Sequence, residues 1–182
     1  MLALRIYKKL YITVRKVQLK ILYSNRITMG KGLSFLKGFK VVFEGEGKIV
    51  IGDGCFFNYN CSLSCIGKIE IGSDCMFGEN VKLYDHNHRF SDPLVKFKDQ
   101  GFKIGSIKIG NNCWVGSNVT ILNNVTIGDN VVIGANCLIY KSIPSNTVVK
   151  NNSELLLEER KERPQPVVNP QSGSHLLEPV QG

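Results

Sequence analysis

Two absences narrow the classes of protein to which this 182-residue sequence can belong. The chain has no run of about 18 apolar residues, so we expect no transmembrane helix. Its charged N-terminus lacks a compact apolar core followed by a small-residue cleavage site, which argues against a cleaved secretory signal. We therefore expect a cytoplasmic protein.

Acidic residues are missing from one part of the chain. Residues 1–43 carry ten Lys and Arg but no Asp or Glu, whereas residues 44–150 carry ten residues of each sign. The net charge of +8 therefore belongs to one arm, which argues against a nucleic-acid footprint over the whole fold. Such an arm can still contact an anionic surface or partner.

What the sequence does contain is a six-residue repeat. From Ile109 the chain reads IGNNCW, VGSNVT, ILNNVT, IGDNVV, IGANCL and IYKSIP. A branched aliphatic residue opens each hexad, Gly often follows, and a small or β-branched residue stands four positions on. The same frame runs earlier in two blocks, through Ile51, Phe57 and Leu63, and through Ile71, Phe77 and Leu83. The step from Leu63, which opens the last hexad of the first block, to Ile71, which opens the second block, is eight residues instead of six.

This period has a direct structural meaning. Each hexad is one short strand and one turn, and three hexads form a triangular coil of about 18 residues. Gly, Asn and Asp supply the positive φ angles that the turns need. The helical period of 3.6 residues and the strand period of 2 residues both fit the apolar pattern poorly. The sequence predicts an all-β, left-handed parallel β-helix over residues 26–150, an exception to the right-handed rule for crossovers.

The same frame explains most of the cysteines, since no CxxC pair is present. Five fall four positions after the aliphatic residue, where Cys acts as a small core hydrophobe: Cys55, Cys61, Cys75, Cys113 and Cys137. Cys65 alone lies outside the frame, and we expect it to be a loop thiol.

The frame breaks once, over residues 85–106, which we expect to leave the coil as a loop. It opens with Asp85-His86-Asn87-His88 and so holds two of the three histidines. One interpretation is a solvated loop with incidental histidines. A zinc site needs three or four ligands, so two histidines would have to pool ligands between subunits. Acid/base chemistry needs one imidazole, with Asp85 a candidate to orient it.

The two ends of the chain suggest helices. Within residues 1–25, apolar side chains recur at intervals of four and three and form a seam: Ala3, Tyr7, Leu10, Val14, Val17 and Ile21. This basic helix either packs on the coil or a neighbouring subunit, or lies on an anionic membrane. A capping box from Asn151 to Glu154 predicts a short C-terminal helix over residues 151–163, followed by a flexible tail over 164–182.

Taken together, the hexads, the histidine loop and the segments IGNNCWVGSNVTIL and VTIGDNVVIGANCLIYKSIPSN resemble the left-handed β-helix acyltransferases. The resemblance covers roughly residues 45–149. It is greatest to the galactoside/maltose, streptogramin and capsule or O-antigen O-acetyltransferase branch. It implies a homotrimer, acetyl-CoA bound between neighbouring coils, and direct acetyl transfer without an acyl-enzyme. Because two histidines cannot complete a zinc site alone, we invoke no metal.

The resemblance also implies roles for individual residues. His88 matches the general base of the family, and His86 is the runner-up. Asp85 remains the candidate, from its place in the sequence, to orient an imidazole. Asn58 matches a position that contacts the acceptor sugar, and Tyr84 is assigned to the same pocket. Positions along the coenzyme A channel are matched by Trp114, Ser117, Ala135 and Lys141.

We therefore expect an acetyl-CoA-dependent O-acetyltransferase that acts on a sugar hydroxyl in surface polysaccharide biosynthesis. The segment LSCIG lacks the carboxylate with which the galactoside branch binds its sugar, which argues against a galactoside acceptor. The segment VVKNNSELL lacks the Gly-x-Pro element that lies against the adenine side of coenzyme A in the family. We expect the acceptor to be a free or lipid-linked carbohydrate, and the enzyme to act in the cytoplasm or at the inner face of the plasma membrane. The alternatives are an N-acyltransferase on an amino-sugar nucleotide, a non-enzymatic β-helix scaffold, and a metalloprotein like the γ-carbonic anhydrases.

Overall fold

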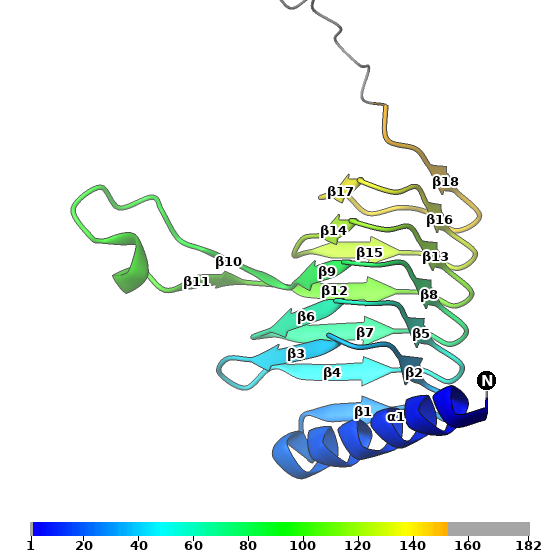
Figure 1. Ribbon diagram of the computed structural model, residues 1–182. Coiled ribbons are helices and arrows are strands. Elements are labelled where there is room, and N and C mark those ends of the chain that lie inside the picture. The colour runs from blue at the N-terminus through cyan, green and yellow to red at the C-terminus, as the bar shows by residue number, and fades with distance from the viewer. Residues whose placement is uncertain (1, 153–182) are drawn as a thin grey trace, which may run out of the picture. The chain divides into compact units, whose positions relative to one another are not determined.

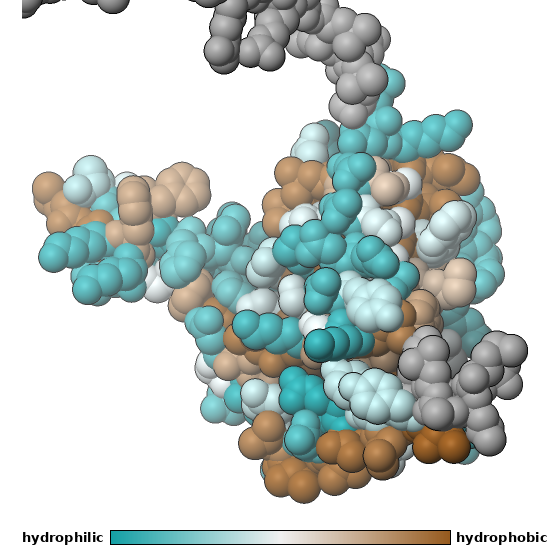
Figure 2. Space-filling view, in the orientation of Figure 1, coloured by the Kyte–Doolittle hydropathy of each residue, from teal (hydrophilic) through white to brown (hydrophobic). Residues whose placement is uncertain are grey.

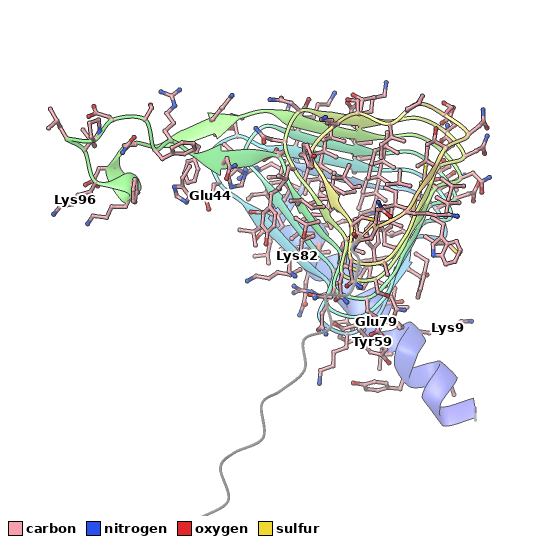
Figure 3. All side chains as sticks on the ribbon, turned by 90° about the horizontal axis from the view of Figure 1, so that it is seen from above. Lys9, Glu44, Tyr59, Glu79, Lys82 and Lys96 are labelled. Carbon is pink, nitrogen blue, oxygen red and sulfur yellow. The ribbon has the colours of Figure 1, made fainter. Side chains whose placement is uncertain are left out.

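The computed structural model describes residues 2–152, which form one helix and a solenoid of short parallel strands (Figure 1). The helix, α1 (Leu2–Tyr23), comes first and lies across the N-terminal end of the solenoid. Successive strands pass through three sheets in turn, so the solenoid is triangular when seen along its axis (Figure 3). This architecture confirms the predicted parallel β-helix of hexapeptide repeats with an N-terminal helix.

The three sheets are defined here by their strands. Sheet A contains β1 (Ile27–Met29), β4 (Lys48–Ile51), β7 (Lys68–Ile71), β12 (Ser106–Ile109) and β15 (Val125–Ile127). Sheet B contains β2 (Ser34–Phe35), β5 (Phe56–Phe57), β8 (Met76–Phe77), β13 (Trp114–Val115), β16 (Val132–Ile133) and β18 (Val148–Val149). Sheet C contains β3 (Lys40–Phe43), β6 (Ser62–Cys65), β9 (Lys82–Tyr84), β14 (Thr120–Ile121) and β17 (Leu138–Ile139).

The repeat produces this stacking because equivalent hexad positions come into register. In sheet A, for example, Ile51 pairs with Ile71, Ile71 with Ile109, and Ile109 with Ile127. The turns use the residues that the sequence predicts. The described non-glycine residues with positive φ are eight asparagines and one aspartate, with φ between 52° and 61°. Both residue types tolerate this left-handed conformation better than other side chains do.

The core is a continuous column of inward-facing side chains. Phe57 and Phe77 stack in it with ring centroids 4.3 Å apart and planes 5° from parallel. The five cysteines of the repeat frame are all buried, as predicted. Cys65 is also fully buried, so its assignment to a loop is wrong. It lies in β6 two residues after Leu63, and alternation along the strand turns both side chains inward.

The helix packs on the coil, but not through its predicted seam. The side chains of Tyr11, Ile12, Leu19 and Tyr23 face the core, and Leu19 is almost fully buried. The described seam residues, among them Leu10 and Ile21, are exposed instead. The helix is thus apolar on two faces, which the seam pattern alone did not show. The predicted C-terminal helix and tail lie outside the described residues, apart from Asn151 and Asn152.

Candidate active site

The insert over residues 85–106 is an antiparallel hairpin that projects from the solenoid at the levels of β9 and β12 (Figure 1). It is built from β10 (His86–His88) and β11 (Phe102–Ile104), with a short 3-10 helix, η1 (Phe97–Asp99), near its tip. His86 pairs with Ile104 and His88 with Phe102. Because strand side chains alternate, the two histidines lie on the same face of the hairpin. Both rings pack against Phe102, at centroid distances of 5.2 and 4.5 Å.

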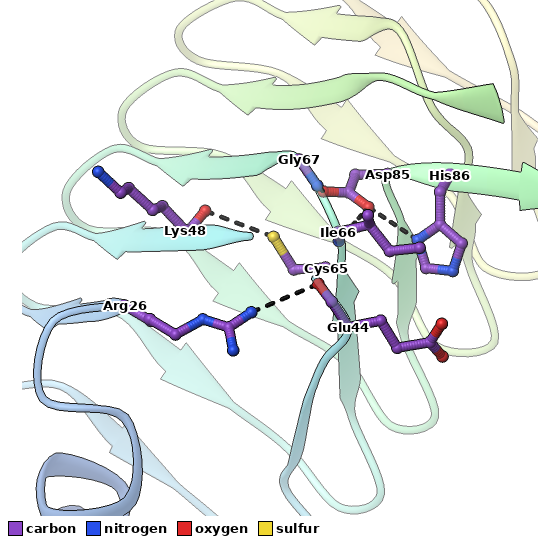
Figure 4. A network of polar contacts seen from close by, with 8 residues as sticks. All are labelled: Arg26, Glu44, Lys48, Cys65, Ile66, Gly67, Asp85 and His86. Carbon is purple, nitrogen blue, oxygen red and sulfur yellow. Dashed lines mark hydrogen bonds and ion pairs between the residues drawn. The ribbon is translucent and has the colours of Figure 1, made fainter. Parts of the chain in front are cut away.

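Asp85 anchors this hairpin to the coil (Figure 4). Its carboxylate is fully buried and accepts hydrogen bonds from the backbone N–H groups of Ile66 and Gly67, each at 2.9 Å. The same carboxylate lies 2.8 Å from Nδ1 of His86. Since the carboxylate accepts the Nδ1 proton, the neutral His86 ring keeps its lone pair on Nε2. Asp85 therefore fixes His86, whereas the sequence left open which imidazole it orients.

The donors Ile66 and Gly67 were not identified from the sequence, although a signal for them exists. They are located in the eight-residue interval that interrupts the six-residue period. The two extra residues form the corner between β6 and β7, and their N–H groups point at Asp85. Beside them, burial and the neighbouring carboxylate raise the pKa of the Cys65 thiol, so this thiol stays protonated. We infer no nucleophilic role for Cys65.

His88 is in a different environment. It is exposed and lines a groove of about 410 Å³ between the hairpin and the adjoining corner of the coil. The other lining residues are Asn87, Arg89, Phe90, Ser91, Lys103, Asn123 and Asn124. Within residues 2–152, the His88 ring forms no hydrogen bond, so both of its nitrogen atoms are available to a ligand. Beside the His88 and Phe90 rings, the groove has three amide groups, one hydroxyl and two cationic groups, which suits a polar, hydroxyl-rich ligand.

Two other predicted residues share this corner of the triangle. Tyr84 ends β9, is partly buried and pairs with Ser64. Lys141 follows β17, two coils above β9 in sheet C, and its Nζ lies 5.6 Å from the centre of the Tyr140 ring. The histidine corner, defined as Tyr84, Asp85, His86, His88 and Lys141, therefore lies where sheet C passes into sheet A.

The remaining predicted residues lie elsewhere. Asn58, Ser117 and Ala135 follow strands of sheet B, at the corner where this sheet passes into sheet C. Ser117 accepts the backbone N–H of Glu79 at 3.2 Å through its Oγ atom. Trp114 is about half exposed in β13, beside Met76 of the neighbouring strand. One chain therefore does not bring all the predicted residues together, because the histidine corner and this second group lie at different corners.

A metal site finds little support in this geometry. Among residues 2–152, no three His, Cys, Asp or Glu side chains are grouped closely enough to hold a metal ion. Asp85 and His86 supply two candidate ligands, but the Asp85 carboxylate is already used by backbone donors. The arrangement is suited to proton transfer by an imidazole beside a polar groove.

Comparisons with known proteins agree with this description. The model of the bacterial transferase hexapeptide family, with six repeats, matches residues 106–141. A maltose O-acetyltransferase from Clostridium difficile is 31% identical over 78% of this chain and 75% of that chain, with a TM-score of 0.59. A hexapeptide-repeat acetyltransferase from Vibrio cholerae is 26% identical over 75% of this chain and 73% of that chain, with a TM-score of 0.64.

A third structure is a galactoside acetyltransferase in complex with coenzyme A. It is 31% identical over 64% of this chain and 59% of that chain, with a TM-score of 0.51. No curated protein matches the chain significantly. The identity to the Clostridium difficile protein extends over most of both chains, and the matched repeats coincide with the upper coils of the solenoid. The chain therefore belongs to the hexapeptide-repeat acetyltransferases, a family of acyltransferases.

Proposed function

We propose that this protein is an acetyl-CoA-dependent O-acetyltransferase that modifies a sugar hydroxyl during the synthesis of a surface polysaccharide. The observation that carries the proposal is the exposed His88 in a polar groove, held by a hairpin that Asp85 anchors to a rigid coil. The similarity to a maltose O-acetyltransferase and to a galactoside acetyltransferase solved with coenzyme A supports the choice of donor and acceptor.

The proposed chemistry requires one base and two correctly placed substrates. His88 takes the proton of the acceptor hydroxyl, whose oxygen attacks the thioester carbonyl carbon of acetyl-CoA. When the tetrahedral intermediate collapses, the carbon–sulfur bond breaks, and the protonated His88 returns the proton to the coenzyme A thiolate. General acid–base catalysis of this kind contributes about 10²–10⁴-fold, and placing both substrates in one cleft contributes further.

The different surroundings of the two histidines support His88 rather than His86 as the base. The side chain of His86 is only 10% exposed, with its Nδ1 engaged by Asp85 and its ring edge-on to Phe102. His88 is exposed to the groove, where a substrate hydroxyl can reach it. We assign Asp85 and His86 the role of holding the hairpin at its base, so that His88 is correctly placed.

The division of the predicted site supports a homotrimer. Acetyl transfer requires donor and acceptor to meet, yet Trp114, Ser117 and Ala135 lie at a different corner from His88. A neighbouring copy that places its sheet B corner against the histidine corner joins the two halves. The outward side chains of Met76, Trp114 and Val148 on sheet B are each half exposed or more, which gives such a copy apolar surface to cover.

The cysteines support the proposed cytoplasmic location. All six are buried and unpaired, which suits a compartment in which thiols stay reduced. The carbohydrate acceptor, either free or lipid-linked, is placed in the groove. There Arg89, Lys103 and Asn123 offer hydrogen-bond donors to sugar hydroxyls.

An assay of thiol release tests this proposal. The purified protein is supplied with acetyl-CoA and a panel of sugars and oligosaccharides, and release of free coenzyme A is followed with a thiol reagent. We expect turnover with at least one hydroxyl acceptor and its loss in His88→Ala, while Lys98→Ala, an exposed control in the same hairpin, retains it. Turnover confined to amino-sugar nucleotides would replace O-acetylation by N-acetylation, and turnover unchanged in His88→Ala would refute the assigned base.

A further inference from the structure

The outward face of α1 forms a continuous apolar stripe, defined here as Ile6, Leu10, Val14, Val17 and Ile21. These residues are spaced by three or four positions, so they lie on one side of the helix. Each is between 46% and 75% exposed, although the opposite side of the same helix is packed on the coil. Five branched apolar side chains in one row are more than scattered surface residues, which normally occur singly.

The stripe lies at the end of the solenoid rather than on one of its sides. Figure 1 shows α1 running across the base, below β1, and Figure 2 shows an apolar band along the same lower edge. The stripe lies opposite the side of α1 that packs on the first coil. A partner that covers the whole stripe therefore approaches along the axis of the solenoid.

Positive charge lies along one flank of the stripe. Lys16, Lys20 and Lys31 line a hollow of about 340 Å³ between α1 and the first coil, together with Thr13, Val17, Met29, Gly30 and Gly32. Burial and the nearby Lys20 lower the pKa of Lys16, as expected where cations crowd together. In the described part of the chain, none of these lysines forms a salt bridge. Asp53 accepts the backbone N–H of Lys31 at 2.7 Å.

The charge distribution indicates which kind of partner covers the stripe. A second copy placed base to base would bring together two arms that each carry ten basic residues and no acidic ones over residues 1–43, and these arms repel each other. An anionic surface is attracted instead. No helix within residues 2–152 is long and apolar enough to cross a bilayer. A helix with an exposed apolar stripe and lysines beside it is suited to the interface of an anionic membrane.

We propose that α1 docks the base of the β-helix onto an anionic phospholipid membrane. The apolar stripe enters the boundary between headgroups and acyl chains, and Lys16, Lys20 and Lys31 contact lipid phosphates. The solenoid axis then stands roughly along the membrane normal. This interaction goes beyond the proposed acetyl transfer and does not depend on it, because it involves neither histidine nor the groove.

Cosedimentation of the full chain with vesicles tests the proposal. We expect binding to vesicles of equal parts phosphatidylcholine and phosphatidylglycerol, little binding to phosphatidylcholine alone, and weaker binding as salt is raised. Lys20→Gln/Lys31→Gln should weaken binding by roughly fivefold for each lysine removed. Leu10→Gln/Ile21→Gln should abolish it. Leu22→Gln changes an exposed apolar residue outside the stripe and serves as the matched control, expected to bind normally.

Circular dichroism of each variant shows whether α1 and the coils remain folded. Four results would overturn the proposal. The first three are no binding to the anionic vesicles, equal binding to both compositions, and equal loss of binding in Leu22→Gln and in the stripe variant. A fourth is a larger assembly in solution that Leu10→Gln/Ile21→Gln dissociates, because a second copy would then cover the stripe.

Discussion

Replacing Asp85 by Ala tests the anchor of the histidine hairpin. The change deletes the acceptor of the Ile66 and Gly67 N–H groups, which leaves one buried and one partly buried donor without a partner. An unsatisfied buried donor costs about 1–3 kcal/mol, and the partly buried one costs less because water reaches it. The lost contact with Nδ1 of His86 adds to this. We therefore expect the free energy of unfolding to fall by roughly 2–4 kcal/mol. Asp85→Asn should lie between the wild type and Asp85→Ala, because its amide keeps one acceptor oxygen.

Urea unfolding followed by circular dichroism measures this change. Asp99→Ala is the matched control, because Asp99 is an exposed aspartate in the same hairpin and its loss should change stability by less than about 0.5 kcal/mol. In the acetyl transfer assay, folded Asp85→Ala should lose turnover more than affinity for acetyl-CoA, since the hairpin that carries His88 is no longer held. Equal stability of Asp85→Ala and Asp99→Ala would refute the role of Asp85 as an anchor.

Three further predictions follow from the same structure. His88→Ala should lower kcat by roughly two orders of magnitude or more at unchanged acetyl-CoA affinity, and His86→Ala should cost less; if His86→Ala proves more damaging, the base is misassigned by two residues. Light scattering should give a trimer of about 60 kDa, from chains of 20.3 kDa, and a monomer at micromolar concentration would contradict the divided site. Burial raises the pKa of the Cys61 thiol to about 11, so the fold favours the protonated form. The contribution of Cys61 to the free energy of unfolding should then be fully present below the unfolded thiol pKa of about 8.5 and be lost as the pH rises toward 11. A Cys61→Ala variant that keeps the full alkaline loss of stability would contradict this cause.

The sequence alone determined the solenoid because its information is local and periodic. A hexad specifies its own strand, its own turn and its inward side chain, and each coil contacts mainly the coils above and below it. Thus the frame that starts at Ile109 predicted the stacking partners, the asparagine turns and the burial of five cysteines. It failed for Cys65, because two extra residues shift the phase at that corner and the strand continues past its expected end.

Tertiary structure decided which side chains of the candidate site meet. Ile66 and Gly67 lie almost twenty residues before Asp85, and only the stacking of two coils brings their N–H groups to its carboxylate. The break in the six-residue period placed both His86 and His88 in a loop. The structure shows that this loop is a hairpin and that burial at its base separates an anchored imidazole from an accessible one. In α1, the seam pattern showed an apolar face correctly. Packing of Leu19 and its neighbours on the coil decided that this face points outward, since a helix with two apolar sides can bury only one of them against a single coil.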